Sequence, residues 1–204
     1  MRPPYVLHLA LALSLLGCSS SPTAAPSTPS AAAPGPALQV SLARPLVATR
    51  GGQEDFRIEE KAGVLEVTWK GGQGKAKVEA DRVKLLDGES LLAKAKSKDN
   101  GFELEDGSGA RLLRFKLKGK PALKVEDGKD QVVMLGDNSA GGFDLTSSGG
   151  ASLGRIERSG EGLAWKTSAL QGTTDLEVGI PLACETLTPP QRACLVIYLA
   201  KVAR

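Results

Sequence analysis

Few side chains in this 204-residue chain have the types and spacing that chemistry requires. The thiols are Cys18, Cys184 and Cys194, and the single imidazole is that of His8. A thiol can carry an acyl group, bind a metal or form a disulfide, and an imidazole can act as a general base or as a metal ligand. Because His8 and Cys18 both lie close to the N-terminus, their chemistry depends on the nature of that segment.

The first 18 residues have the three parts of a secretory signal. Arg2 supplies a positive charge, residues 6–16 are mostly apolar, and the small Gly17 precedes Cys18. The apolar run is too short for a hydrocarbon core of about 30 Å, which needs about 20 helical residues, so an uncleaved membrane anchor is a weak alternative. A plain secretory signal is the better alternative, although it does not require a cysteine at the cleavage site.

The quartet Leu15-Leu16-Gly17-Cys18 resembles the lipobox of bacterial lipoproteins. This resemblance implies that Cys18 becomes the first residue of the mature chain and carries three acyl chains. Two or more chains give a stable anchor because each buried methylene adds about 0.8 kcal/mol. It further implies a lipid-anchored location in the bacterial cell envelope, where Ser19 after the cysteine favours the outer over the inner membrane.

Removal of the signal leaves the mature chain without histidine, since His8 leaves with it. This excludes a Ser-His-Asp or Cys-His arrangement and any His-ligated zinc or haem site. Cys184 and Cys194 remain as an even pair, which can form a disulfide in an oxidising compartment. The alternative is two buried thiols, because Cys194 lies in an apolar segment. Their spacing rules out a catalytic Cys-x-x-Cys pair.

The composition then divides the chain into a signal (1–18), a tether (19–37) and one domain (38–204). Residues 19–37 are all Ser, Pro, Thr, Ala or Gly, and this composition favours an extended, semi-rigid spacer. The domain is long enough for one real core. The chain has 26 Lys and Arg against 23 Asp and Glu, and Arg2 leaves with the signal, so no strong nucleic-acid field is expected.

A repeat runs through the domain with a period of about 20 residues. Each unit has two apolar residues spaced by two, followed by a turn pair and an apolar return segment. The apolar pairs start at Val67, Val83, Phe102, Leu123, Phe143 and Leu163, and the return segments include Ala76, Leu91, Leu113, Val132, Leu153 and the run Leu176, Val178 and Ile180. Such units are hairpins. Six such units predict about twelve strands. One or two more are expected at Phe56 and Ile58 and at Leu38, Val40 and Leu42.

A meander of this length covers its apolar face and protects its edges by closing into a barrel. About twelve strands leave a wider bore than side chains fill, so something must occupy it. Residues 189–203 are apolar on nearly every side, with Thr188 as N-cap and Pro189 at the first helical position. The sequence therefore predicts a mainly β fold, a closed antiparallel barrel filled by its C-terminal helix.

This plan resembles the tubby C-terminal and phospholipid-scramblase group of barrels. The resemblance covers residues 56–204 and rests on the meander and the terminal apolar helix, with no phosphoinositide-binding or calcium-binding motif matched. It implies a closed barrel threaded by its last helix, often in proteins that act at membrane surfaces.

Two cation triplets alternate with other residues, so that on strands each triplet shares one face. They are Lys94, Lys96 and Lys98, and Arg114, Lys116 and Lys118. One interpretation is a contact for anionic lipid headgroups, to which each cation adds about 1 kcal/mol. The other is a solvated outer face on which Lys guards exposed strands.

Other patterns predict neither a metal nor a cofactor. Asp87, Asp106 and Asp127 each precede a glycine, where Asp stabilises a turn through its own backbone. Asp137-Asn138 followed by Gly141-Gly142 lacks the spacing of a calcium loop. The glycine-rich stretches are not followed by helices, so phosphate-loop geometry is lacking.

We expect a non-enzymatic, lipid-anchored envelope protein with a structural or interaction role, whose partners are the membrane, through Cys18, and a protein or an anionic lipid surface. The alternative is a carrier for a lipid or other apolar ligand in the barrel interior. The two differ in the free volume that the terminal helix leaves inside.

Overall fold

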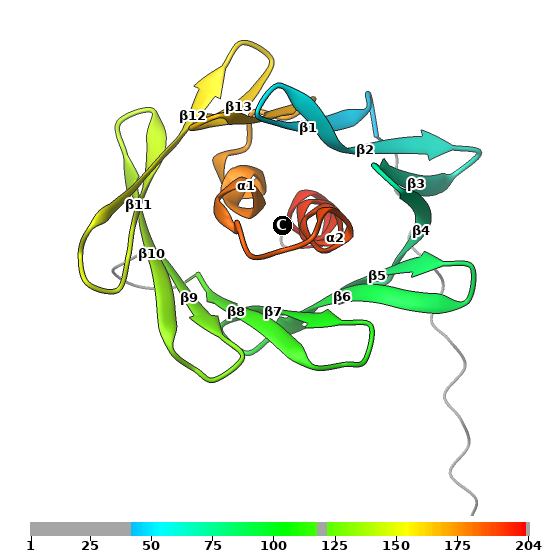
Figure 1. Ribbon diagram of the computed structural model, residues 1–204, viewed down its shortest axis with the longest axis horizontal. Coiled ribbons are helices and arrows are strands. Elements are labelled where there is room, and N and C mark those ends of the chain that lie inside the picture. The colour runs from blue at the N-terminus through cyan, green and yellow to red at the C-terminus, as the bar shows by residue number, and fades with distance from the viewer. Residues whose placement is uncertain (1–41, 118–121, 203–204) are drawn as a thin grey trace, which may run out of the picture. The chain divides into compact units, whose positions relative to one another are not determined.

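A computed structural model describes residues 42–117 and 122–202, which all belong to the second of two units of the chain, Gly35–Arg204. In this unit fourteen antiparallel strands follow one another around a closed barrel, which closes where β1 pairs with β14 (Figure 1). The strands are β1 Leu46–Arg50, β2 Gln53–Lys61, β3 Val64–Trp69, β4 Gly72–Val78, β5 Arg82–Asp87, β6 Ser90–Lys98, β7 Gly101–Asp106, β8 Arg111–Lys116, β9 Leu123–Asp127, β10 Val132–Ser139, β11 Gly142–Thr146, β12 Ser152–Ser159, β13 Gly162–Trp165 and β14 Ser168–Gln171.

The structure confirms the predicted barrel, with two strands more than the dozen expected. The predictions for the signal, for Cys18, for the tether and for Lys118 lie outside the described residues.

Alternation of apolar and polar residues explains the strands. On β5, for example, Val83 and Leu85 are fully buried while Lys84 between them faces outward. Most strands repeat this pattern around the ring, so the inward face of the sheet forms a continuous core.

The Asp residues of the predicted turns act as side-chain acceptors at the ends of strands. Asp106 Oδ1 accepts hydrogen bonds from the backbone N–H groups of Ser108 and Ala110 at 2.9 and 3.0 Å. Asp127 Oδ1 accepts equivalent bonds from Lys129 and Gln131 at 2.8 and 2.9 Å. Each aspartate therefore stabilises the loop that follows it. The pKa of Asp106 is lowered above all by a hydrogen bond from the Ser108 hydroxyl, at 2.7 Å, and then by the backbone bonds, whereas that of Asp127 is lowered by the bonds from Gln131 and Lys129.

Helix α2 (Pro189–Lys201) lies inside the ring, as predicted (Figure 1). Its N-terminus has a capping box, in which the Thr188 backbone N–H donates to Gln191 Oε1 at 2.9 Å and the Thr188 side chain accepts from the backbone of Gln191. Residues 192–199 of the helix are all buried. A helix that is apolar around its circumference is stable only inside a core, and here the barrel supplies that core.

Small residues on the inner face of the barrel make room for α2. The helix packs most closely on β6 and β5, where Ala93 and Ala95 are fully buried. The approach is close enough for Cys194 Sγ to donate to the backbone oxygen of Val83, at 3.6 Å. Near the other end of the helix, the Tyr198 hydroxyl lies 2.8 Å from Ser97 Oγ.

One charged residue of α2 is buried, and the sequence patterns did not single it out. The Arg192 side chain is 5% exposed and forms a bidentate pair with Asp55 of β2, at 2.8 and 2.9 Å. Arg192 also donates to the backbone oxygen of Leu187. The pair fixes the helix against a strand 137 residues earlier in the sequence.

The final predicted return segment is wrong. Leu176, Val178 and Ile180 do not form a strand: they belong to a 3-10 helix, η1 (Leu176–Gly179), and to α1 (Ile180–Ala183), which also lie within the ring. The strand that pairs with β13 is the shorter β14, and Gly172, with φ +94°, ends it. Pro181 in the first turn of α1 favours a helix over a strand because its ring fixes φ and removes an N–H donor.

The first strand also differs from the prediction. Leu42 lies outside any strand, Leu38 and Val40 fall outside the described residues, and β1 begins at Leu46.

Candidate functional site

The helices cover the inner face of the barrel unevenly. Helix α2 packs against β2 to β7, η1 packs against β11 to β13, and α1 packs against β14. Within the described ranges, no helix packs substantially against β8, β9 or β10. Strands β8 to β10 therefore form a thinly covered arc of the interior, between the strands that α2 covers and those that η1 covers.

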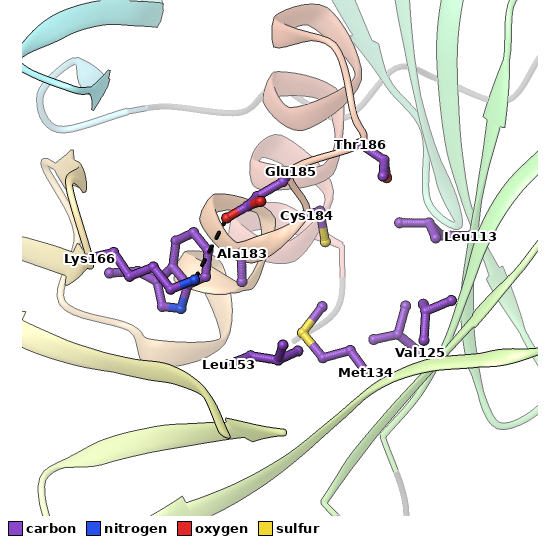
Figure 2. A pocket seen from close by; sticks show the side chains of 11 residues that line it. Leu113, Val125, Met134, Leu153, Lys166, Ala183, Cys184, Glu185 and Thr186 are labelled. Atoms are coloured by element: carbon purple, nitrogen blue, oxygen red, sulfur yellow. Dashed lines mark ion pairs between the residues drawn. The ribbon is translucent and has the colours of Figure 1, made fainter. Parts of the chain in front are cut away.

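A cavity of about 320 Å³ lies at this arc (Figure 2). Strands β8, β9, β10, β12 and β13 line it together with the segment that joins α1 to α2. The lining residues are Leu113, Val125, Val133, Met134, Leu153, Trp165, Lys166, Ala183, Cys184, Glu185 and Thr186. A volume above about 300 Å³ is at the lower end of the range for small-molecule sites.

The cavity is apolar inside and polar at its mouth. Leu113, Val125 and Met134 form a buried wall, whereas Lys166 and Glu185 are exposed. Figure 2 shows Lys166 and Glu185 approaching each other on one side of the cavity, with Met134, Val125 and Leu113 on the other. This division is suited to a molecule with an apolar body and a polar end.

Two irregularities in the strands shape the wall. The pairing of β9 with β10 shifts register between Val132 and Met134, so Val133 is an additional residue, and its 41% exposure places an apolar side chain at the mouth. On β12, Gly154 has φ +129°, and a Cβ there would lie 3.1 Å from Trp165 Nε1. Glycine therefore lets the indole pack directly against the β12 backbone.

Trp165 and Lys166 form the polar corner of the cavity. Lys166 Nζ lies 4.4 Å from the centroid of the Trp165 ring, a cation–π distance, and 3.8 Å from Glu185 Oε1. The Trp165 side chain is buried, and its Nε1–H has no hydrogen-bond partner in the described part of the chain. A buried N–H donor without an acceptor costs free energy of folding, so Trp165 Nε1–H is available to donate a hydrogen bond to a ligand.

Both cysteines of the domain are free, buried thiols. The disulfide alternative is thus not formed in the structure, and the alternative of two buried thiols applies. Cys184 Sγ donates to Ile180 O at 3.7 Å, while Cys194 faces β5 on the other side of the interior. Burial raises the pKa of each thiol to about 12, which leaves Cys184 a poor nucleophile even though it lines the cavity.

The predicted cation triplets lie on β6 and β8, and β7 separates them. Lys94, Lys96 and Lys98 project from β6, and Arg114 and Lys116 project from β8. The acidic residues of β7 lie in register between the two sets: Glu105 is opposite Lys94, and Glu103 is opposite Lys96 and Arg114.

These acids organise the cations into a network. Glu105 is 2.5 Å from Lys94 and also pairs with Lys96, and Glu103 lies within 4.0 Å of Lys98 and Arg114. Burial alone would raise the pKa of Glu105, but its bonds to Lys94 and Lys96 outweigh this effect and lower it. The positive charge of the outer face is thus partly neutralised at these pairs.

A similar arrangement surrounds Glu126 on β9. Its carboxylate lies 2.7 Å from Lys116 and 3.0 Å from Lys124, and the hydrogen bonds from these two ammonium groups, the first above all, lower its pKa. The charged outer face therefore continues across β9.

The described residues contain no group of three or more His, Cys, Asp or Glu side chains placed to hold a metal ion. Over the same residues, none of the helices has the length and apolar character needed to cross a membrane. No family model, no curated protein and no solved structure matches the chain. The resemblance in plan to the tubby and scramblase barrels therefore stays a prediction.

Proposed function

We propose that this protein is a non-enzymatic, lipid-anchored module of the bacterial cell envelope that acts through the outer face of its barrel. In this proposal Cys18 carries the lipid and the tether holds the barrel near the membrane. Helix α2 fills the interior next to β2 to β7, and the cavity beside α1 lies next to β8 to β10. Because α2 occupies the interior along β2 to β7, these strands have only their outer face free for a partner, which supports a role at the outer surface.

The observation that carries this proposal is the basic character of β4 to β9. On these strands Lys and Arg outnumber Asp and Glu. The Asp residues stand at the ends of strands, and the glutamates are Glu103, Glu105 and Glu126. The cations are Lys75, Lys77, Arg82, Lys84, Lys94, Lys96, Lys98, Arg111, Arg114, Lys116 and Lys124. After the ion pairs are formed, positive charge remains for an anionic lipid surface.

Vesicle sedimentation tests this surface contact separately from the anchor. The full chain with Cys18→Ser, purified without detergent, is expected to sediment with phosphatidylglycerol vesicles at low salt and to be released at high salt. Lys75→Glu with Lys77→Glu should weaken this binding about tenfold or more, because each cation near such a surface adds about 1 kcal/mol. The matched reversals Arg155→Glu and Arg158→Glu on β12 should have a smaller effect. Equal losses from both pairs would contradict a surface centred on β4 to β9.

Fractionation of cells tests the anchor itself. The wild-type chain is expected in the membrane fraction, and Cys18→Ser should move it to the soluble fraction because the acyl chains are lost. An unchanged distribution would show that Cys18 does not anchor the protein.

A second candidate function is that of a carrier for a small apolar ligand, and the cavity beside α1 favours it. The terminal helix lies within the ring yet leaves about 320 Å³ between the joining segment and β8 to β10. The available volume suits a short chain rather than a whole membrane lipid.

A further inference from the structure

We propose that the cavity at Trp165 and Lys166 binds a medium-chain aliphatic carboxylate, with its alkyl chain inside and its carboxylate at the mouth. This inference rests on the carrier function, the second candidate above, and specifies the chemistry of its ligand.

The apolar wall defines the body of the ligand. Leu113, Val125, Met134 and Leu153 offer no hydrogen-bonding side chain, and Cys184 is held protonated by burial. A volume of about 320 Å³ accommodates on the order of ten water-sized groups of about 30 Å³ each. An unbranched chain of about eight carbons with its carboxylate fits this space.

The charges at the mouth define the polar end. Lys166 is the cation that lines the cavity, and its partner Glu185 lies 3.8 Å away, with the two side chains 50% and 60% exposed. Such an exposed pair is weak and readily exchanged. A monoanion can replace Glu185 at Lys166, whereas a dianion such as a phosphate monoester would meet one cation and the nearby carboxylate of Glu185. The mouth therefore favours a carboxylate.

Trp165 supplies a second donor once Lys166 moves. A Cβ placed on Gly154 would lie 3.1 Å from Trp165 Nε1 and 3.5 Å from Lys166 Cε, so both side chains lie over the same point of the β12 backbone. The Lys166 side chain is half-exposed, and it sits on a residue with φ +51°, at the end of β13. When its ammonium turns toward a ligand carboxylate, its stem uncovers Nε1–H. This unpartnered donor can then bind the second carboxylate oxygen.

Titration of the full chain with Cys18→Ser by NMR tests the proposal, with sodium octanoate as the probe and 1-octanol as its neutral counterpart. We expect saturable binding of octanoate that shifts the indole N–H signal of Trp165, which the variant Trp165→Phe assigns. Octanol should bind at least tenfold more weakly. Lys166→Met should weaken octanoate at least tenfold and leave octanol unchanged.

The chain offers a matched control, because Trp69-Lys70 repeats the Trp-Lys pair at the end of β3. Lys70→Met should not change octanoate binding, and the Trp69 indole signal should not shift. Ala183→Phe should fill the cavity and remove binding of both probes. Thr186→Phe at the exposed mouth serves the same purpose if Ala183→Phe does not fold.

The outcomes separate this inference from the function on which it rests. Equal affinities for octanoate and octanol, unaffected by Lys166→Met, would overturn the carboxylate and leave a carrier of neutral chains. Failure of both probes to bind would overturn the ligand and the carrier function together. Octanoate binding that survives Ala183→Phe and Thr186→Phe would place the ligand elsewhere and reject this cavity.

Discussion

The arc of the barrel from β4 to β6 and the arc from β8 to β13 have the same strand pattern but differ inside. The first has small inward residues such as Gly74, Ala93 and Ala95, and α2 packs directly on it. The second has large ones such as Phe143 and Trp165, and still encloses the cavity. Small side chains let α2 approach β5 and β6 closely, whereas β8 to β10 have no substantial helix contact within the described residues and leave unfilled space beside them. The packing of the interior thus differs with the helix that contacts each strand.

The largest expected effect comes from removing the packing partner of the first arc. Deletion of residues 189–204 takes away α2 and leaves the inner faces of β2 to β7 without cover. We expect loss of the cooperative thermal transition measured by circular dichroism. A cooperative transition that survives this deletion would show that the barrel does not depend on its internal helix.

The next effect concerns the buried pair that ties α2 to β2. Asp55→Leu leaves the Arg192 guanidinium buried without its carboxylate, and breaking a buried pair in this way costs about 3–5 kcal/mol. Urea unfolding measures the loss. Glu161→Gln, at the exposed pair with Arg44, is the control and should cost less than about 1 kcal/mol. Similar losses from both variants would contradict a structural role specific to Asp55.

Matched enlargements test the contrast in packing directly. Ala95→Leu adds volume where α2 is in contact, and overpacking of this kind costs about 1–3 kcal/mol. Ala183→Leu adds the same atoms beside the cavity, where space exists, and should change the free energy of unfolding by less than about 0.5 kcal/mol. If the second variant proves as destabilising as the first, the cavity is not open space.

The smallest effect concerns the outer face. Glu126 has a lowered pKa in the folded chain because of its bonds to Lys116 and Lys124, so its stabilising contribution is present at neutral pH. It is lost as pH falls below about 4.5 through the lowered pKa. Glu126→Gln should therefore cost up to about 1 kcal/mol at pH 7 and progressively less toward lower pH. Glu89→Gln in an exposed turn is the control and should change the free energy of unfolding at pH 7 by less than about 0.5 kcal/mol.

Local sequence was sufficient to predict the hairpins and α2. Alternation at Val83 and Leu85 has strand periodicity, and Thr188-Pro189 begins a run that is apolar on all sides, so each signal lies within one element. The run at Leu176, Val178 and Ile180 also alternates, which made it resemble a strand. Only its place inside the ring, and Pro181 in its first turn, decide for a helix.

The candidate site could not be predicted in the same way. The cavity is the space left between segments that pack on different strands, and no single stretch of sequence records it. The pairing of Lys94 with Glu105 depends on the register of β6 and β7, and that of Arg192 with Asp55 on the placement of α2. The resemblance of Trp165-Lys166 to Trp69-Lys70 was visible in the sequence, but only the cavity distinguishes the two pairs.

The closure of the ring has a consequence for biogenesis. Strand β1 finds its second partner in β14, and β2 receives its buried counter-ion from Arg192. The earliest and latest elements of the described residues thus complete each other, so the core is not complete until most of the chain has been made. Contacts so distant in sequence form slowly. The barrel therefore stays open until the residues of α2 and β14 have been made.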